Sequence, residues 1–84
     1  MIITDVRIRK IEDANRLKAV AEITIDDAFV VHEIRIIEGQ NGLFVAMPSK
    51  QVGENQYKDI AHPINVETRK MLEEAILKAY NEAE

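Results

Sequence analysis

Three side chains near the middle of the sequence are of the types that contact nucleic acid. Lys50 and Lys58 flank the polar segment QVGENQY, whose last residue is Tyr57. A lysine ammonium binds a phosphate oxygen, and an exposed tyrosine ring can stack on a base. A surface tyrosine beside a lysine is also common elsewhere, so the weight of these three candidates depends on what lies near them.

Two more cations, Arg69 and Lys70, follow soon after the expected start of a helix. Asn65 is a good N-cap residue, and the first amide hydrogens of a helix bind anions. Cations are slightly disfavoured at this end of the helix dipole, so two of them together suit a phosphate. The alternative is that Arg69 pairs with Glu73 and Lys70 with Glu74 at i,i+4. Spacing alone does not decide between a phosphate site and these ion pairs. All five candidates are nevertheless predicted to lie together beside the segment HPIN and to form a binding site for a partner.

The two histidines do not form a recognisable catalytic or metal site. His32 lies inside a predicted strand, where a packed and hydrogen-bonded ring is expected, and His62 precedes Pro63. Zinc needs three or four ligands, usually with short local spacing, and the sequence holds no such cluster. No nucleophile motif or glycine-rich phosphate loop accompanies either histidine. We therefore expect no enzyme activity, metal, cofactor or small-molecule substrate.

Asp26 and Asp27 are adjacent carboxylates that could bind a metal. On an extended backbone their side chains would point apart, and adjacent aspartates are typical of turns. The pair is therefore interpreted as a turn.

Alternating apolar and polar residues predict an antiparallel sheet. After Asn65 the period changes, and apolar residues at spacings of three and four predict one stripe of a C-terminal helix: Leu72, Ala75, Ile76, Ala79, Tyr80 and Ala83. Residues 48–56 are expected to be a polar loop, and residues 13–16 (DANR) a turn. The fold class is α+β: about five strands followed by one helix that begins after Asn65. The expected strands span residues 2–11, 17–25, 28–37, 43–47 and 57–61.

The alternation also predicts which side chains share a face. In the first strand, Ile2, Thr4, Val6 and Ile8 are expected together on one face. The third strand is apolar on both faces: one carries Phe29, Val31 and Ile37, and the other carries Val30, Ile34 and Ile36. Such a strand is covered on both sides. One helix, about 10 Å across, covers only about two strands that lie ~4.8 Å apart. The uncovered apolar surface therefore predicts a homodimer.

Composition places the chain among small globular proteins. Its 84 residues are expected to form a single domain spanning residues 1–84, and 46% of them are apolar. There is no cysteine, signal peptide pattern or membrane-spanning apolar run, which predicts a cytoplasmic protein that does not enter the membrane. The net charge of −4 argues against nucleic acid, yet residues 7–18 carry five cations and only two carboxylates.

Several stretches closely resemble the SpoVG family of bacterial proteins, which includes stage V sporulation protein G and septation proteins. The matching stretches are ITDVRIRK, LKAVAEITIDDAFVVHEIRIIEG, NGLFVAMPSK and KDIAHPIN, and the likeness runs from about Met1 to Tyr80. The resemblance implies a small α+β homodimer without catalytic activity or cofactor. It also implies binding to DNA, and in some members to RNA, in the regulation of genes for sporulation, septation and capsule or virulence.

Basic residues of the helix and of the preceding loop are implicated in that family's nucleic-acid contacts. Carried onto this sequence, they correspond to Lys50 in the loop and to Arg69 and Lys70 in the helix. The family often has a second basic residue and a Pro-Asp-Gly type turn after the loop lysine, where this sequence has residues 51–55, QVGEN. That departure puts the contribution of the loop in doubt. The alternative function is an adaptor of the division or sporulation machinery that binds protein through an exposed strand edge.

Overall fold

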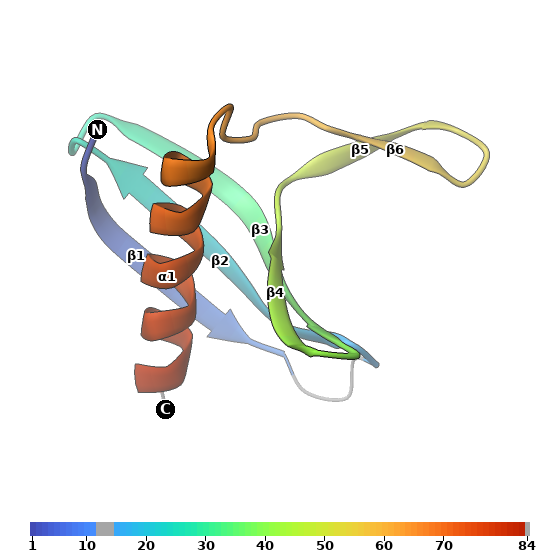
Figure 1. Ribbon diagram of the computed structural model, residues 1–84, viewed down its shortest axis with the longest axis horizontal. Helices are drawn as coiled ribbons and strands as arrows, with labels where there is room; N and C mark the ends of the chain where they lie inside the picture. Colours follow the sequence, from blue (N-terminus) through green and yellow to red (C-terminus); the bar gives the residue numbers. More distant parts are fainter. Residues whose placement is uncertain (12–14, 84) are drawn as a thin grey trace.

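The computed structural model describes residues 1–11 and 15–83, and it confirms an α+β fold with a C-terminal helix (Figure 1). Four antiparallel strands form a sheet in the order β1-β2-β3-β4, and β5 and β6 form a separate hairpin. Of the predicted turn at 13–16, residues 13 and 14 lie outside the described residues. The elements are β1 (Ile3–Lys10), β2 (Leu17–Ile25), β3 (Phe29–Gly39), β4 (Gly42–Ala46), β5 (Ser49–Gly53), β6 (Gln56–Asp59) and α1 (Val66–Glu82).

The predicted polar loop after Pro48 is instead a strand. Residues Ser49–Gly53 pair with Gln56–Asp59, so the described strands number six in two sheets rather than about five in one. Asn55 makes the turn with a φ of 60°, a left-handed conformation that asparagine tolerates better than most residues. The strand β5 could not be predicted from alternation, because its side chains are largely exposed and polar residues occupy both faces.

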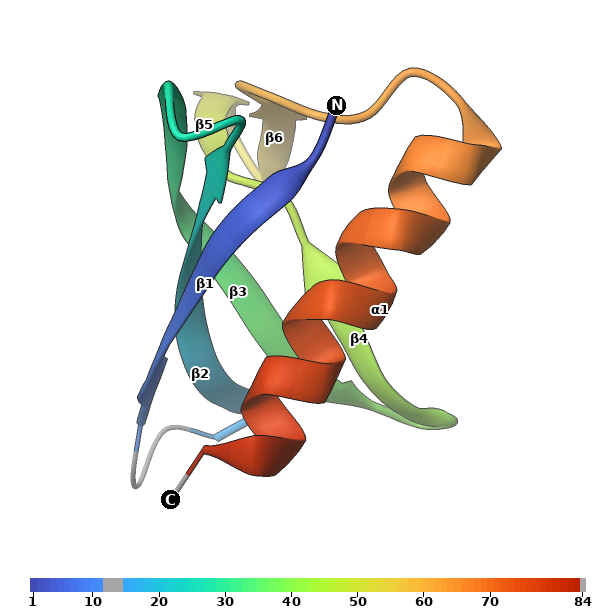
Figure 2. The same cartoon turned by 90° about the vertical axis from the view of Figure 1, so that its left-hand side faces the viewer.

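The helix packs against one face of the four-stranded sheet (Figure 2). Its predicted apolar stripe is confirmed, because Leu72 and Ile76 are buried and Tyr80 packs at the margin of the core. The sheet contributes small and branched residues from its central strands. The buried core consists of Ala19, Ala21, Ile23, Ile34, Ile36, Val45, Met47, Leu72 and Ile76.

An irregularity in β1 changes the face that was predicted for its first residues. The pairing register shifts between Ile3 and Asp5. One extra residue reverses the alternation of side chains, so Ile3 packs on the core while Ile2 is 66% exposed. The prediction that Ile2 shares a face with Val6 and Ile8 is therefore wrong.

A second bulge has the same effect in β3. Ala21 pairs with Ile34 and Ile23 pairs with Val31, so β3 has one residue more than β2 over this stretch. Val31 consequently packs on the core beside Ile34, although the alternation placed them on opposite faces. The extra residue coincides with Glu33, whose φ is 61°.

Both ends of α1 are capped, one locally and one by a distant residue. The Asn65 side chain accepts a hydrogen bond of 2.7 Å from the Thr68 amide, which confirms the predicted N-cap. The last turn contains no basic residue. Lys10 of β1 supplies one instead, because its Nζ donates to the Ala83 carbonyl at 2.9 Å and lies 5.0 Å from the centre of the Tyr80 ring.

The described helix is neither long nor apolar enough to cross a bilayer. The helix lies on one side of the sheet and leaves the opposite face open (Figure 2). The β5–β6 hairpin projects beyond the sheet (Figure 1).

The packing of α1 on the sheet predicts a large effect for one side chain. Ile76→Ala should lower the free energy of unfolding by about 2–5 kcal/mol, because Ile76 is 0% exposed and its loss leaves a cavity. Urea unfolding measures the change. The matched control is Ile64→Ala, at a side chain that is 89% exposed, and it should alter stability by less than ~0.5 kcal/mol. Equal effects of the two substitutions would contradict this account of the core.

Candidate nucleic-acid interface

The fold brings Lys50 and Lys58 directly opposite each other in the β5–β6 hairpin. Cross-strand partners point to the same side, with Cβ atoms about 4.5–5.5 Å apart. In the sequence these lysines only flank a segment; in the structure they form one cationic pair. Like charges at such positions destabilise a hairpin. The pair therefore has an electrostatic cost that a bound anion would offset.

Tyr57 belongs to the other side of the hairpin. It pairs with Gln51, one position along from the lysine pair, and side chains alternate along a strand. The residue is 68% exposed and borders a cleft between the hairpin and the open face of the sheet. Tyr57 and Lys58 are adjacent in sequence but serve different surfaces.

Arg69 and Lys70 also diverge, because successive helix residues point about 100° apart. Arg69 borders a shallow depression at the start of α1 with His62 and Ile64. Lys70 lies along the helix with Glu74 and Lys78. Within the described part of the chain, neither cation makes an ion pair shorter than 4.0 Å, so the i,i+4 pairs with Glu73 and Glu74 do not form.

The five candidates therefore occupy separate places in one chain. Figures 1 and 2 both show the hairpin apart from the start of α1, with residues 60–65 running between them. The expected single cluster beside HPIN is not formed within one chain. The structure brings together Lys50 and Lys58 only.

The histidines and the Asp pair have local partners. His32 is not packed as predicted: its side chain is 68% exposed, and its Nδ1 lies 2.7 Å from Glu22 Oε2. His62 Nδ1 lies 3.0 Å from the Pro63 carbonyl oxygen. Asp26 and Asp27 have φ values near 50° and form the predicted turn, in which Asp26 Oδ1 accepts a hydrogen bond from the Ile2 amide. Among the described residues, no three potential ligands cluster as a metal site.

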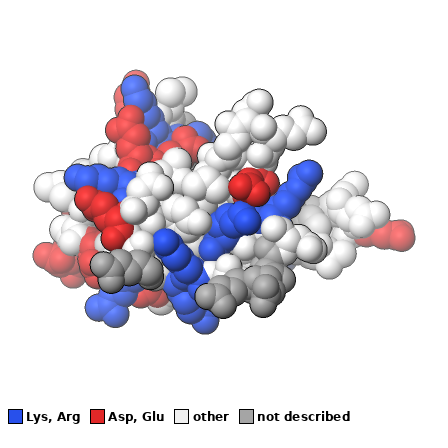
Figure 3. Space-filling model, turned by 90° about the horizontal axis from the view of Figure 1, so that it is seen from below, with Lys and Arg blue, Asp and Glu red and all other residues white. Residues whose placement is uncertain are grey.

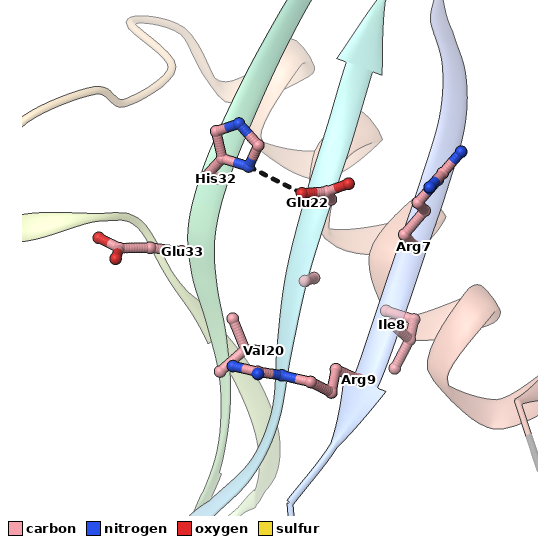
Figure 4. Close-up of a pocket in the computed structure, with 8 residues that line it drawn as sticks. Arg7, Ile8, Arg9, Val20, Glu22, His32 and Glu33 are labelled. Atoms are coloured by element: carbon pink, nitrogen blue, oxygen red, sulfur yellow. Dashed lines mark hydrogen bonds and ion pairs between the residues drawn. The ribbon is translucent and has the colours of Figure 1, made fainter.

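Three arginines on the open sheet face were missing from the candidates. Arg7 and Arg9 project from β1, and Figure 4 shows them on the side that carries His32 and Glu22. Together these residues border a hollow of about 480 Å³. The alternation in DVRIRK already indicates that Arg7 and Arg9 share a face. Arg35 could not be found in this way, because the bulge at Glu33 decides its neighbours.

On the face shown in Figure 3, positive charge is mixed with negative charge. Seen from below, lysine and arginine side chains lie near the middle of the face with carboxylates beside them (Figure 3). Arg7 pairs with Asp5, and Lys18 lies 3.7 Å from Glu38. The surplus of cations in residues 7–18 is thus partly neutralised in the fold, whereas Lys50 and Lys58 face each other.

The sequence matches a family model described as SpoVG over residues 1–82. Relatives named "Putative septation protein SpoVG" include one from Clostridioides difficile strain 630. It is 58% identical over 83 residues, covering 99% of this chain and 90% of the relative. Another, from Caldanaerobacter subterraneus, is 59% identical over 83 residues, with 99% and 91% covered. A third, from Macrococcus caseolyticus, is 55% identical over 84 residues, with 100% and 73% covered. The chain belongs to the SpoVG family, as its sequence motifs indicated.

The lysine pair predicts a salt effect on the hairpin. In the native chain, added salt should slow amide hydrogen exchange in β5 and β6, because it screens the repulsion between Lys50 and Lys58. Lys58→Glu converts the repulsion into attraction and should reverse the sign of the salt effect. NMR-detected exchange measures both. The control Lys78→Glu makes the same charge change on α1 and should leave hairpin exchange as in the native chain. An identical salt response in the native chain and in Lys58→Glu would show that the two lysines do not interact.

Proposed function

We propose that this member of the SpoVG family is a homodimeric nucleic-acid-binding regulator of gene expression, linked to septation and sporulation. It binds DNA, with RNA as a second class of nucleic acid, and it is not an enzyme and uses no cofactor. Contacts are made mainly to the phosphate backbone by Lys50, Lys58, Arg69 and Lys70, with Tyr57 available to stack on a base.

The observation that carries the proposal is the opposition of Lys50 and Lys58 in a weakly supported hairpin. All four residues of β6 are exposed, so few apolar contacts hold the hairpin together. A repulsive lysine pair is costly there, and substitution of either lysine would relieve the cost. A phosphate placed between the two ammonium groups turns the repulsion into two attractive contacts.

The same hairpin supports the proposed homodimer. An isolated two-stranded hairpin is marginally stable in water. Here Val52 is 52% exposed, and Ile60, just after β6, is 64% exposed. A second copy that packs against these side chains would cover apolar surface and support the hairpin.

Dimerisation also multiplies the contacts with a polyanion. Counting Lys50, Lys58, Arg69 and Lys70 in each chain, a dimer offers about eight phosphate contacts, enough for a steep dependence of affinity on salt. Two separated sets of cations on one particle add avidity, because the second set binds with a high effective concentration. Sites that are apart within one chain can thus act on one nucleic acid.

An adaptor function is supported by a different observation. The strands β1 and β4 are the edges of the four-stranded sheet, and an edge strand can add a strand of another protein. The net charge of −4 and the septation names of the relatives favour this alternative. In that case the protein would bind a component of the division or sporulation machinery and no nucleic acid.

Removing the cations tests the nucleic-acid proposal. We expect Arg69→Ala with Lys70→Ala, and separately Lys50→Ala with Lys58→Ala, to weaken binding to unrelated duplex and single-stranded DNA. Each pair should also flatten the slope of log affinity against log salt, because fewer counterions are released. Fluorescence anisotropy over a salt series measures both quantities.

The matched control is Lys78→Ala with Lys18→Ala, which removes two cations elsewhere and should leave the slope close to the native value. If the native protein binds none of these nucleic acids at low salt, the adaptor function replaces the proposal. If it binds but neither double variant alters the slope, these four residues do not form the interface.

Sedimentation tests the dimer. The native chain should sediment as a dimer at micromolar concentration, and Val52→Asp should shift it toward the monomer by placing a charge in the apolar contact. Val66→Asp is the matched control, because Val66 is also exposed and opens α1, where a carboxylate is favourable. A well-folded native monomer would contradict the proposed homodimer.

A further inference from the structure

We propose that the cleft between the β5–β6 hairpin and the open sheet face seats one unpaired guanine base of a single-stranded nucleic acid. The inference rests on the proposed function and extends it from phosphate contacts to base recognition. The cleft measures about 330 Å³, at the lower end of the range for small-ligand sites, about 300–1,000 Å³. The residues that line it include Tyr57 on one side and Arg9, Val20, Glu33 and Arg35 on the other.

Arg35 holds the two walls beside each other. Its Nη2 donates hydrogen bonds to the Met47 carbonyl at 3.3 Å and to Ser49 Oγ at 3.2 Å. These acceptors lie where the chain passes from β4 into β5. The Arg35 guanidinium, on β3, therefore connects the base of the hairpin to the main sheet by hydrogen bonds. Tyr57 pairs with Gln51 on β5, so its position depends on the same anchor.

Glu33 is the second unusual feature of the cleft. Its φ of 61° lies in the left-handed region, and the other described non-glycine residues with positive φ are Asp26, Asp27 and Asn55. Aspartate and asparagine tolerate this region, whereas a glutamate there is strained. Strained residues that persist in a structure cluster at functional sites. The strained residue here is one that lines the cleft.

The direction of Glu33 suits a ligand rather than a neighbouring side chain. Figure 4 shows its carboxylate pointing away from β2, on the other side of β3 from the His32–Glu22 contact. Although Arg9 and Arg35 also line the cleft, no ion pair shorter than 4.0 Å involves Glu33 in the described residues. An acceptor is thus available beside an aromatic ring and two guanidinium groups.

Guanine matches this set of groups better than the other bases. Its Watson–Crick edge presents an N1–H and an N2–H side by side, and a carboxylate can accept both at once. Thymine and uracil present one N–H between two carbonyl oxygens, which repel a carboxylate. Charge-assisted, bidentate hydrogen bonds are the stronger and more selective kind. Tyr57 can stack on the base face, and Arg9 lies where it could hold a neighbouring phosphate.

A duplex could not use this cleft, because its Watson–Crick edges are occupied and its bases are stacked. Sequence-specific recognition of single strands uses those edges together with aromatic stacking. Lys50 and Lys58, on the opposite side of the hairpin, would bind phosphates irrespective of sequence. One side of the hairpin would therefore bind phosphates through Lys50 and Lys58, and the other side would recognise a base through the cleft at Tyr57.

The experiment compares fluorescein-labelled oligothymidines that differ only at a central position. The native protein should bind the oligonucleotide with one central guanine about tenfold more tightly than the one with thymine, the preference expected of one good bidentate contact. Anisotropy titrations at constant salt measure the affinities. Central adenine and cytosine should fall between, because each offers a single amino group.

Glu33→Gln and Glu33→Asn should both abolish the guanine preference while leaving affinity for oligothymidine at or above the native value. Asparagine tolerates the left-handed backbone, so Glu33→Asn should also keep or raise the melting temperature measured by circular dichroism. Glu82→Gln is the matched control: it removes one carboxylate at the far end of α1 and should keep the preference. Tyr57→Ala should lose affinity for all probes, about tenfold, whereas Tyr57→Phe should retain it.

Three outcomes would overturn the inference, and they are distinguishable. Salt-dependent binding without a guanine preference, or with a preference that survives in a folded Glu33→Asn variant, would remove the base site and leave the proposed function standing. Absence of binding to every probe at low salt would overturn both.

Discussion

The burial of one helix against one face of the four-stranded sheet is the interaction on which the rest of the structure depends. Leu72 and Ile76 of α1 meet Ile23, Ile34 and Ile36 of the sheet, and these side chains are buried or nearly so. Two small residues of β2, Ala19 and Ala21, belong to the same buried core. The core that this contact forms contains the nine apolar side chains that are buried among the described residues. The opposite face of the sheet and the hairpin are left for other purposes.

The open sheet face and the β5–β6 hairpin contain features that stability alone would not favour. Lys50 faces Lys58, Glu33 adopts a left-handed backbone, and Tyr57 stands exposed. Each of these features lowers the stability of the folded chain, and a single substitution would remove the effect. They lie in or beside the hairpin rather than in the core, so the core can tolerate them. Local departures from otherwise consistent folding rules are expected at functional sites.

The open face and the hairpin also explain how an acidic protein could bind a polyanion. The total charge of −4 averages over carboxylates of the C-terminal helix that lie far from the hairpin. Surface charges separated by more than about 8–10 Å interact weakly at physiological salt. Local arrangement, such as the lysine pair, therefore matters more than the sum. The fold creates that arrangement by pairing two segments that the sequence leaves apart.

The sequence by itself determined the class of the fold, the start of the helix at Asn65, its buried stripe and the turn at Asp26 and Asp27. These features arise from local periodicity and from side chains that bond to nearby backbone, so they can be read over a few residues. The family, too, was identifiable from four short stretches. The sequence also indicated that Arg7 and Arg9 share a face.

Only the tertiary structure decided which isoleucines point inward, because a single bulged residue reverses every later position of a strand. It likewise decided that Lys50 and Lys58 form a pair, that Tyr57 borders a cleft with the open sheet face, and that Arg35 anchors the hairpin. Those relations join different strands, and no local pattern records the register in which two strands meet.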